Sequence, residues 1–211
     1  MEIIYKYYPH IEQIHRKIFN EIRYPKIMDF FIPPKELIDK IATPDSMTST
    51  YRIIPPFKNL RDTDQMLSAI DMGIIGEIED YYRFDSVVIR KEKVKIDINK
   101  QEISQVVLEG LRNAVIHGSK NLVPVMYGTF YGTNGVCHGF QDGGKYFTRE
   151  STKNIFENKT PIKIFGEEVE GLSGTHVGTL EIYESSDAIF VDTMQNVLFC
   201  VQYRDRLISP R

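Results

Sequence analysis

The sequence lacks the features that mark secreted and membrane-spanning chains. It contains only two cysteines, Cys137 and Cys200, which are too few for a disulfide framework and have no C-x-x-C spacing. It has no run of about 18 apolar residues, and the N-terminal residues carry charges every few positions instead of the apolar stretch of a signal peptide. We therefore expect a soluble, unprocessed, cytoplasmic protein that does not enter a membrane.

An excess of charge of one sign is also absent. The 211 residues include 26 Lys and Arg against 29 Asp and Glu, so the net charge is only -3. The chain therefore lacks the global basic field that binding to a phosphate backbone needs, and we expect no nucleic-acid partner. The hydrophobic fraction of 42% is ordinary for a globular protein, and the length allows one large domain or a domain with an extension.

The pattern of the chain changes near residue 85. Six prolines between Pro25 and Pro56 indicate an irregular connector. The apolar spacing predicts helices over 10–22, 34–42 and 63–82, the last interrupted at Gly73 and Gly76. We therefore separate a helical and Pro-rich N-terminal extension, residues 1–85, from a domain of residues 86–211.

The second part of the chain mixes strand and helix patterns. Apolar and polar residues alternate from Val87 to Ile98, which predicts a strand or a hairpin, and a helix is expected to begin after Asn99-Lys100. The next elements are expected to be strands over 123–132 and 135–144, a short strand over 162–165, a short helix after a Gly-rich turn, and strands over 188–192 and 197–203. This order predicts an α+β fold, a two-layer α/β sandwich with a mixed, mostly antiparallel sheet.

A polar stripe runs along the helix that follows Asn99. Glu109, Asn113 and His117 are four residues apart, and four residues turn a helix by only about 40° beyond one full turn, so these side chains share one face. The apolar residues Ile103, Val107, Leu111 and Ala114 fall on another sector and can pack on a sheet. The stripe is either a functional face or a solvated helix edge, and the spacing alone does not decide between them.

The stretch "LEGLRNAVIHG" resembles the N-box of the GHKL superfamily, which contains gyrase, heat-shock chaperone, histidine kinase and mismatch-repair ATPases. It is most similar to the E-x-x-x-N-A-x-x-H-G form found in anti-sigma-factor serine kinases and sensor histidine kinases. The resemblance implies that Asn113 is a Mg²⁺ ligand, a role that suits its hard carbonyl oxygen. It also implies that Glu109 is the catalytic base or the partner of a metal-bound water. His117 either contacts the phosphates or caps the helix, and Gly118 suits a left-handed turn at the helix end.

A second stretch, "FQDGGKYF", resembles the family's Asp-x-Gly-x-Gly motif. The resemblance implies that Asp142 accepts a hydrogen bond from the adenine amino group, and that Gly144 is one of the two motif glycines. Tyr146 stands where the family has the second glycine, which is a departure from the pattern. Without the first motif, Asp-Gly-Gly is simply a turn.

A third stretch, "GLSGTHVGTLEIYE", resembles the Gly-rich turn of the family, which leads into a helix whose N-terminal amides face the phosphates. By this resemblance Gly171, Gly174, Gly178 and Thr179 contact the nucleotide. The segment 145–170 between the second and third motifs would be the ATP lid, and its basic residues are either phosphate ligands or part of a solvated loop.

The three motifs together imply the Bergerat ATP-binding fold, with ATP and Mg²⁺ as ligands. The implied activity is ATP hydrolysis or phosphoryl transfer to a protein partner, as an ATPase or a protein serine/threonine kinase. The alternative is a non-catalytic interaction module that retains a degenerate form of this fold. The extension 1–85 has no recognisable motif, and it could be a homodimer strap, a cap over the nucleotide or a partner surface.

A zinc site built from Cys137, His138, Cys200 and His176 is the remaining metal hypothesis. Adjacent residues on a strand point to opposite faces, and neither C-x-x-C nor H-x-x-x-H spacing occurs. We expect buried thiols instead of a zinc site.

Overall fold

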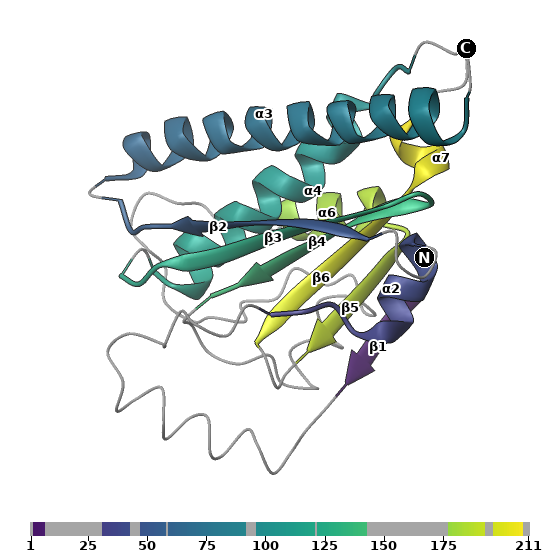
Figure 1. The fold of residues 1–211 in the computed structure, drawn as a ribbon. Helices are drawn as coiled ribbons and strands as arrows, with labels where there is room; N and C mark the ends of the chain where they lie inside the picture. Colours follow the sequence, from purple (N-terminus) through teal and green to yellow (C-terminus); the bar gives the residue numbers. More distant parts are fainter. Residues whose placement is uncertain are drawn as a thin grey trace.

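The chain is built around one six-stranded sheet in a computed structural model (Figure 1). The strand order is β1-β5-β6-β4-β3-β2, in which β1 runs parallel to β5 and every other pair is antiparallel. The expected α+β fold with a mixed, mostly antiparallel sheet is thus confirmed. The strands are β1 Glu2–Lys6, β2 Thr48–Ile54, β3 Val125–Gly132, β4 Gly135–Gln141, β5 Ala188–Asp192 and β6 Val197–Tyr203. The structure describes residues 2–6, 31–42, 47–57, 59–91, 96–120, 122–142, 177–192 and 196–208.

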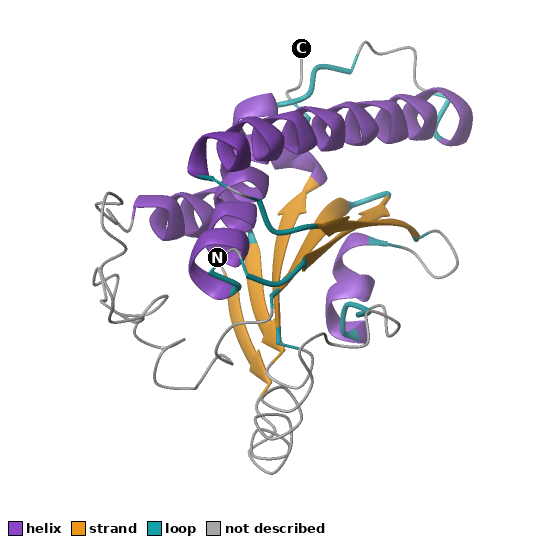
Figure 2. Ribbon diagram, turned by 90° about the vertical axis from the view of Figure 1, so that its left-hand side faces the viewer, coloured by secondary structure: helices purple, strands orange, loops and turns teal. Residues whose placement is uncertain are grey.

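Helices cover both faces of the sheet unequally (Figure 2). The long helices lie on one face, and the short α2 lies on the other. Two π-helical turns, η1 and η2, continue α3 and α4. The helical elements are α2 Lys35–Ile41, α3 Leu60–Phe84, η1 Asp85–Ile89, α4 Lys100–Arg112, η2 Asn113–Gly118, α6 Val177–Ser185 and α7 Arg204–Leu207. Among the described helices, none is long and apolar enough to cross a bilayer.

The two faces of the sheet have separate apolar cores. The larger core lies under the long helices and joins residues such as Ile78 of α3 and Leu111 of α4 to Phe140 of β4. The smaller core lies under α2 and centres on Phe31, whose ring meets those of Phe130 and Phe199 edge-on at 6.0 and 5.8 Å. Because the central strands are buried on both faces, they read as nearly continuous apolar runs.

Most elements around the candidate site form where the sequence predicts them. The Asn99 side chain caps α4 by accepting a hydrogen bond from the Glu102 amide at 3.4 Å. Strands β3 and β4 form the expected hairpin, and β5 and β6 have the predicted bounds. The short helices expected over 34–42 and after the Gly-rich turn are present as α2 and α6.

The expected break in the helix over 63–82 is absent. Helix α3 runs unbroken through Gly73 and Gly76, because Leu67, Ile74 and Ile78 recur at helical spacing and are all fully buried. Burial of an apolar face contributes more to a helix than the cost of about 1 kcal/mol for each glycine.

The strand expected from Val87 to Ile98 is wrong for the described residues of that stretch. Residues 85–89 form η1, because the buried Asp85 carboxylate accepts hydrogen bonds from Arg90 at 3.0 Å and Arg204 at 2.6 Å. Val87 is exposed on this turn, and Ile98 makes only an isolated bridge. The apparent alternation came from surface valines, whereas the ion pair to a distant arginine holds the helical turn in place.

The sheet takes strands from both sides of residue 85. Residues 48–54, expected to be irregular, form the edge strand β2, in which only Ile54 is buried, so the sequence has no alternation to signal it. Strand β1 pairs with β5, far away in the sequence. The helix expected over 10–22, the strand over 162–165 and the lid over 145–170 lie outside the described residues.

Candidate functional site

The polar stripe lies on α4 and its continuation η2, at the border of their buried face. Ile103, Val107, Leu111 and Ala114 are buried, as their helical sector predicts. Glu109 and Asn113 are half-buried and His117 is exposed. Because residues four apart lie side by side on a helix, the carboxylate of Glu109 and the carboxamide of Asn113 share one face. The stripe is therefore neither part of the core nor fully exposed, and both interpretations of its spacing stay open at this point.

The helix widens beyond Asn113, in η2. The Asn113 amide still donates to the carbonyls of Glu109 and Gly110, four and three residues back, whereas the Ser119 amide donates to the carbonyl of Ala114 at 2.8 Å, five residues back. Such π-helical turns are rare and often occur at functional sites. The left-handed residue that follows is Lys120, with φ of 51°, and not Gly118 as expected.

Gly118 instead leaves space for the Asp142 side chain. A Cβ atom at position 118 would overlap the Asp142 carboxylate, so the end of η2 and the residue after β4 touch each other. Only glycine allows this approach. The close contact brings the second motif residue, Asp142, to the end of the helix that carries Glu109 and Asn113.

Asn196 fixes Asp142 from the other side. It precedes β6 with a left-handed φ of 53°, and its side-chain amide donates to the main-chain oxygen of Asp142 at 3.0 Å and to its Oδ1 at 3.4 Å. Asn196 is buried, and its Oδ1 has no hydrogen-bond partner within the part of the chain that the structure describes. A carboxylate and an unpaired amide oxygen side by side are suited to a ligand that donates N–H groups. The sequence analysis missed Asn196, although an asparagine directly before a strand is a left-handed turn signal.

Arg112 is a second residue that the sequence analysis missed. Its Nη1 donates to Glu109 Oε1 at 2.5 Å, and its Nε lies 3.4 Å from Asp64 Oδ1 on α3. Burial lowers the pKa of Arg112, but the hydrogen bond and the charge of Glu109, together with Asp64, outweigh this and hold it above its ordinary value. The proposed base is therefore ion-paired in this structure.

Helix α6 lies along α4, on the side away from α3. Its last residue, Ser185, donates to Gln105 of α4 at 2.7 Å, and the Gln202 amide donates to the carbonyls of both Ser185 and Glu102 at 2.8 Å. The first turn of α6 is at the opposite end of this helix from Ser185. That first turn contains Gly178 and Thr179, whereas the predicted Gly144, Gly171 and Gly174 lie outside the described residues.

Within the described ranges, Cys137, Cys200 and His138 form no metal-binding group, and His176, the fourth member of the zinc hypothesis, lies outside those ranges. Cys137 faces the smaller core, and Cys200 faces the larger one. His138 is buried in a hydrogen-bonded chain: its Nδ1 lies 2.7 Å from the Tyr127 hydroxyl and its Nε2 lies 3.2 Å from Gln202 Oε1. Because the Gln202 amide nitrogen already donates to two carbonyls, its oxygen must accept from His138, which is therefore the neutral Nε2–H tautomer.

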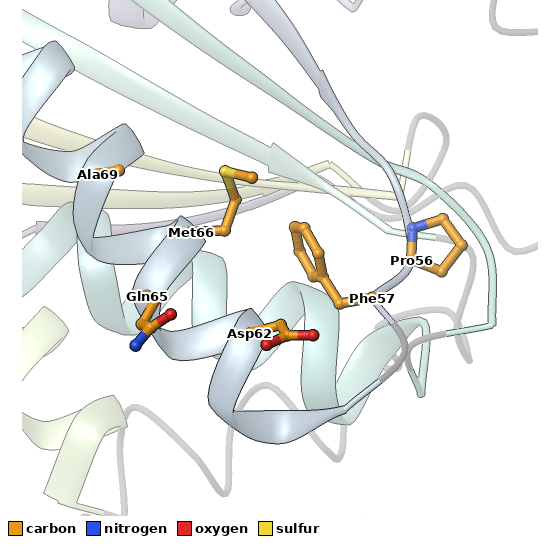
Figure 3. A pocket seen from close by; sticks show the side chains of 6 residues that line it. All are labelled: Pro56, Phe57, Asp62, Gln65, Met66 and Ala69. Atoms are coloured by element: carbon orange, nitrogen blue, oxygen red, sulfur yellow. The ribbon is translucent and has the colours of Figure 1, made fainter.

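An open pocket of about 580 Å³ lies elsewhere, between the β2–α3 connection and the first turns of α3 (Figure 3). Phe57 and Met66 form its apolar wall, and the Asp62 carboxylate at its rim accepts a hydrogen bond from Asn59 at 2.7 Å. None of the residues expected from the sequence motifs lines this pocket. The contact of Asp142 with Gly118, by contrast, joins residues of two separate sequence motifs.

No protein-family model matches the sequence, and no curated protein matches it. The function therefore has to be inferred from the residues themselves.

Proposed function

We propose that this chain binds ATP with Mg²⁺ through a Bergerat-type domain of the GHKL class. The observation that carries the proposal is the contact of Asp142 with Gly118, at the end of the helix that presents Glu109 and Asn113. These residues come from two motifs that are separated by a strand hairpin, and they meet at one end of one helix. The sheet with its main helical layer on one face supports the same proposal.

In this proposal Asp142 reads the adenine amino group and Asn196 is its positioning residue. The amide of Asn196 holds the main chain and the carboxylate of Asp142, and its unpaired Oδ1 is a further acceptor beside it. An adenine amino group has two N–H donors, so a site with two neighbouring acceptors matches its chemistry. A base that lacks this amino group would leave the buried Asn196 Oδ1 unsatisfied.

The donor set at Asn113 fits a magnesium ion that keeps most of its water. Across the described ranges, no three His, Cys, Asp or Glu side chains cluster around a possible metal position. We therefore propose a site that the protein and the nucleotide form together. Mg²⁺ in nucleotide sites is commonly held by one or two protein oxygens together with the phosphates, and the half-buried Asn113 carboxamide supplies one such oxygen. The bound ion would neutralise charge that develops on the phosphates.

Glu109 is the proposed base. Its carboxylate would take the proton of an attacking water or of a Ser or Thr hydroxyl on a partner protein. The attacking oxygen forms a bond to the γ-phosphorus, while the bond from that phosphorus to the bridging oxygen breaks and its electron pair leaves with ADP. Positioning supplies most of the remaining catalysis. The dimer or cap role of residues 1–85 stays a separate hypothesis.

Titration calorimetry with ATP in millimolar Mg²⁺ tests the proposal. We expect binding by the wild-type chain, and a loss of affinity of at least about tenfold in Asp142→Asn and Asn113→Ala, since each removes a charged or metal-bound contact. Gln101→Ala is the matched control for Asn113, because Gln101 is an exposed carboxamide on the same helix. No binding by the wild-type chain, or equal affinities in all variants, would exclude the proposed site.

The alternative function is a nucleotide-binding switch without catalysis. One observation favours it: the Glu109 carboxylate is ion-paired with Arg112, whose Nη1 lies 2.5 Å from Glu109 Oε1. In the sequence, Tyr146 in place of a motif glycine points the same way. A rise in melting temperature with ATP, without release of ADP or phosphate in the presence of candidate protein partners, would select this alternative.

A further inference from the structure

One guanidinium, that of Arg112, lies between carboxylates of two helices. It donates to Glu109 Oε1 on its own helix at 2.5 Å, and its Nε lies 3.4 Å from Asp64 Oδ1 on α3. The Glu109 side chain is only 16% exposed, whereas Arg112 is 35% and Asp64 is 58% exposed. The more buried carboxylate, that of Glu109, therefore lies closer to the guanidinium than the more exposed carboxylate of Asp64.

The register between α3 and α4 keeps the Asp64 carboxylate within contact distance of Arg112. Ser104 of α4 donates to the buried Asp71 of α3 at 2.7 Å. Asp64 precedes Asp71 by about two helical turns, and Arg112 follows Ser104 by about two turns, as antiparallel neighbours require. The hydrogen bond between Ser104 and Asp71 thus fixes the register of α4 against α3, and this register places Asp64 beside Arg112.

The single positive charge cannot serve both carboxylates equally. A guanidinium has five N–H donors in a rigid plane, so it contacts both carboxylates at once, and a shift toward Asp64 would lengthen its bond to Glu109. While Nη1 donates to Glu109 Oε1, the carboxylate is held toward Arg112 on its own helix, which fixes the direction in which it points. The structure shows the bridged arrangement, in which the contact to Glu109 is the shorter of the two.

We propose that Arg112 is a positioning residue that holds Glu109 in a resting pair, and that its transfer to Asp64 of α3 frees the carboxylate for the attacking oxygen. This inference rests on the proposed function, because it concerns the base of that same site. It gives the chain before residue 86 a direct influence on the reaction, since Asp64 belongs to that part. Anything that moves the first turns of α3 would then change turnover without touching the nucleotide.

Steady-state ATPase measurements on single and double variants test this inference. Asp64→Asn weakens the alternative partner while Glu109 keeps its pair, so we expect kcat to fall about fivefold while KM for ATP stays constant. Arg112→Gln removes the restraint and should raise kcat by a similar factor. In the Arg112→Gln background, Asp64→Asn should have no further effect, because the two residues act through one contact. Arg112→Lys should partly restore the wild-type value.

Asp80→Asn is the control, because Asp80 is an exposed carboxylate of the same helix and 80% of its side chain is accessible. A merely structural pair would lower the melting temperature of Arg112→Gln and leave kcat unchanged, and that result would overturn the inference. Asp64 is largely exposed, so Asp64→Asn tests whether the Arg112 contact affects kcat should Arg112→Gln fail to fold.

If the wild-type chain binds ATP without turnover, a gain of turnover in Arg112→Gln supports the restraint of Glu109 by Arg112, and the absence of such a gain refutes it. Failure of the wild-type chain to bind ATP at all would instead refute the proposed function, and this inference with it.

Discussion

Lowering the pH from 7.5 to 4.5 should destabilise the protein through one buried imidazole, that of His138. Burial lowers the pKa of His138 to about 4 from its ordinary value of 6.5, and only the weaker effect of its hydrogen bond to Gln202 opposes this. In the folded state the ring is neutral, because its Nδ1 accepts from Tyr127 and its Nε2–H donates to Gln202. A second proton would have to displace the Tyr127 hydrogen bond inside the core.

The magnitude follows from proton linkage. The unfolded chain takes up a proton as the pH falls through about 6.5, whereas the folded chain resists until about pH 4, so stability is complete above pH 6.5 and is lost between these values. At about 1.4 kcal/mol for each pH unit between the two pKa values, the total loss below pH 4 is about 3 kcal/mol. The free energy of unfolding should already be lower by about 1.4 kcal/mol at pH 5.5.

Urea unfolding at four pH values, followed by circular dichroism, measures this loss. The matched variant is His138→Gln, since a glutamine can accept from Tyr127 and donate to Gln202 but does not titrate. Carboxylates change the pH dependence of stability equally in wild type and His138→Gln. The difference between their unfolding free energies at each pH therefore measures the contribution of the imidazole. If wild type and variant lose stability in parallel from pH 7.5 to 4.5, then His138 is not the buried neutral group described above.

Three further changes test the site and the core. Gly118→Ala should cost about 1 to 3 kcal/mol of unfolding free energy, because its methyl group overlaps the Asp142 carboxylate, and it should weaken ATP binding; an unchanged urea midpoint would contradict the close contact. Asn196→Gly keeps the left-handed backbone but loses the hydrogen bonds to Asp142, so calorimetry should show weaker ATP binding with only a small change in melting temperature. Phe31→Ala should cost about 3 to 5 kcal/mol in urea unfolding, since the ring fills the smaller core between α2 and the sheet; a cost under about 1 kcal/mol would show that α2 does not cover a packed face.

The candidate site depends both on contacts between residues that are close in the sequence and on contacts between residues that are far apart in it. The helical spacing of Glu109 and Asn113 is a property of consecutive residues, and the structure keeps it. Asn196 and Arg112 were missed because their importance comes from their partners. Asn196 acts on Asp142 from a neighbouring strand turn, and the second partner of Arg112 is on another helix. Neither partner can be read from the residues on either side.

The sequence by itself determined the elements whose stability is local. Helix α4 has its own capping residue at Asn99, and the β3–β4 hairpin has its turn residues. Strands β5 and β6 are apolar runs that could only be buried. These features follow from propensity, capping and burial within a few neighbouring residues.

Only the tertiary structure decided the rest. Strand β2 is held at the sheet edge by pairing with β3, η1 is held by the ion pair of Asp85 with Arg204, and Gly118 is required because Asp142 arrives there from another strand. In each case the energy comes from a partner that is distant along the chain, so no window of neighbouring residues contains the information. The two motifs could therefore be identified separately in the sequence, but their meeting at one end of α4 is a property of the fold.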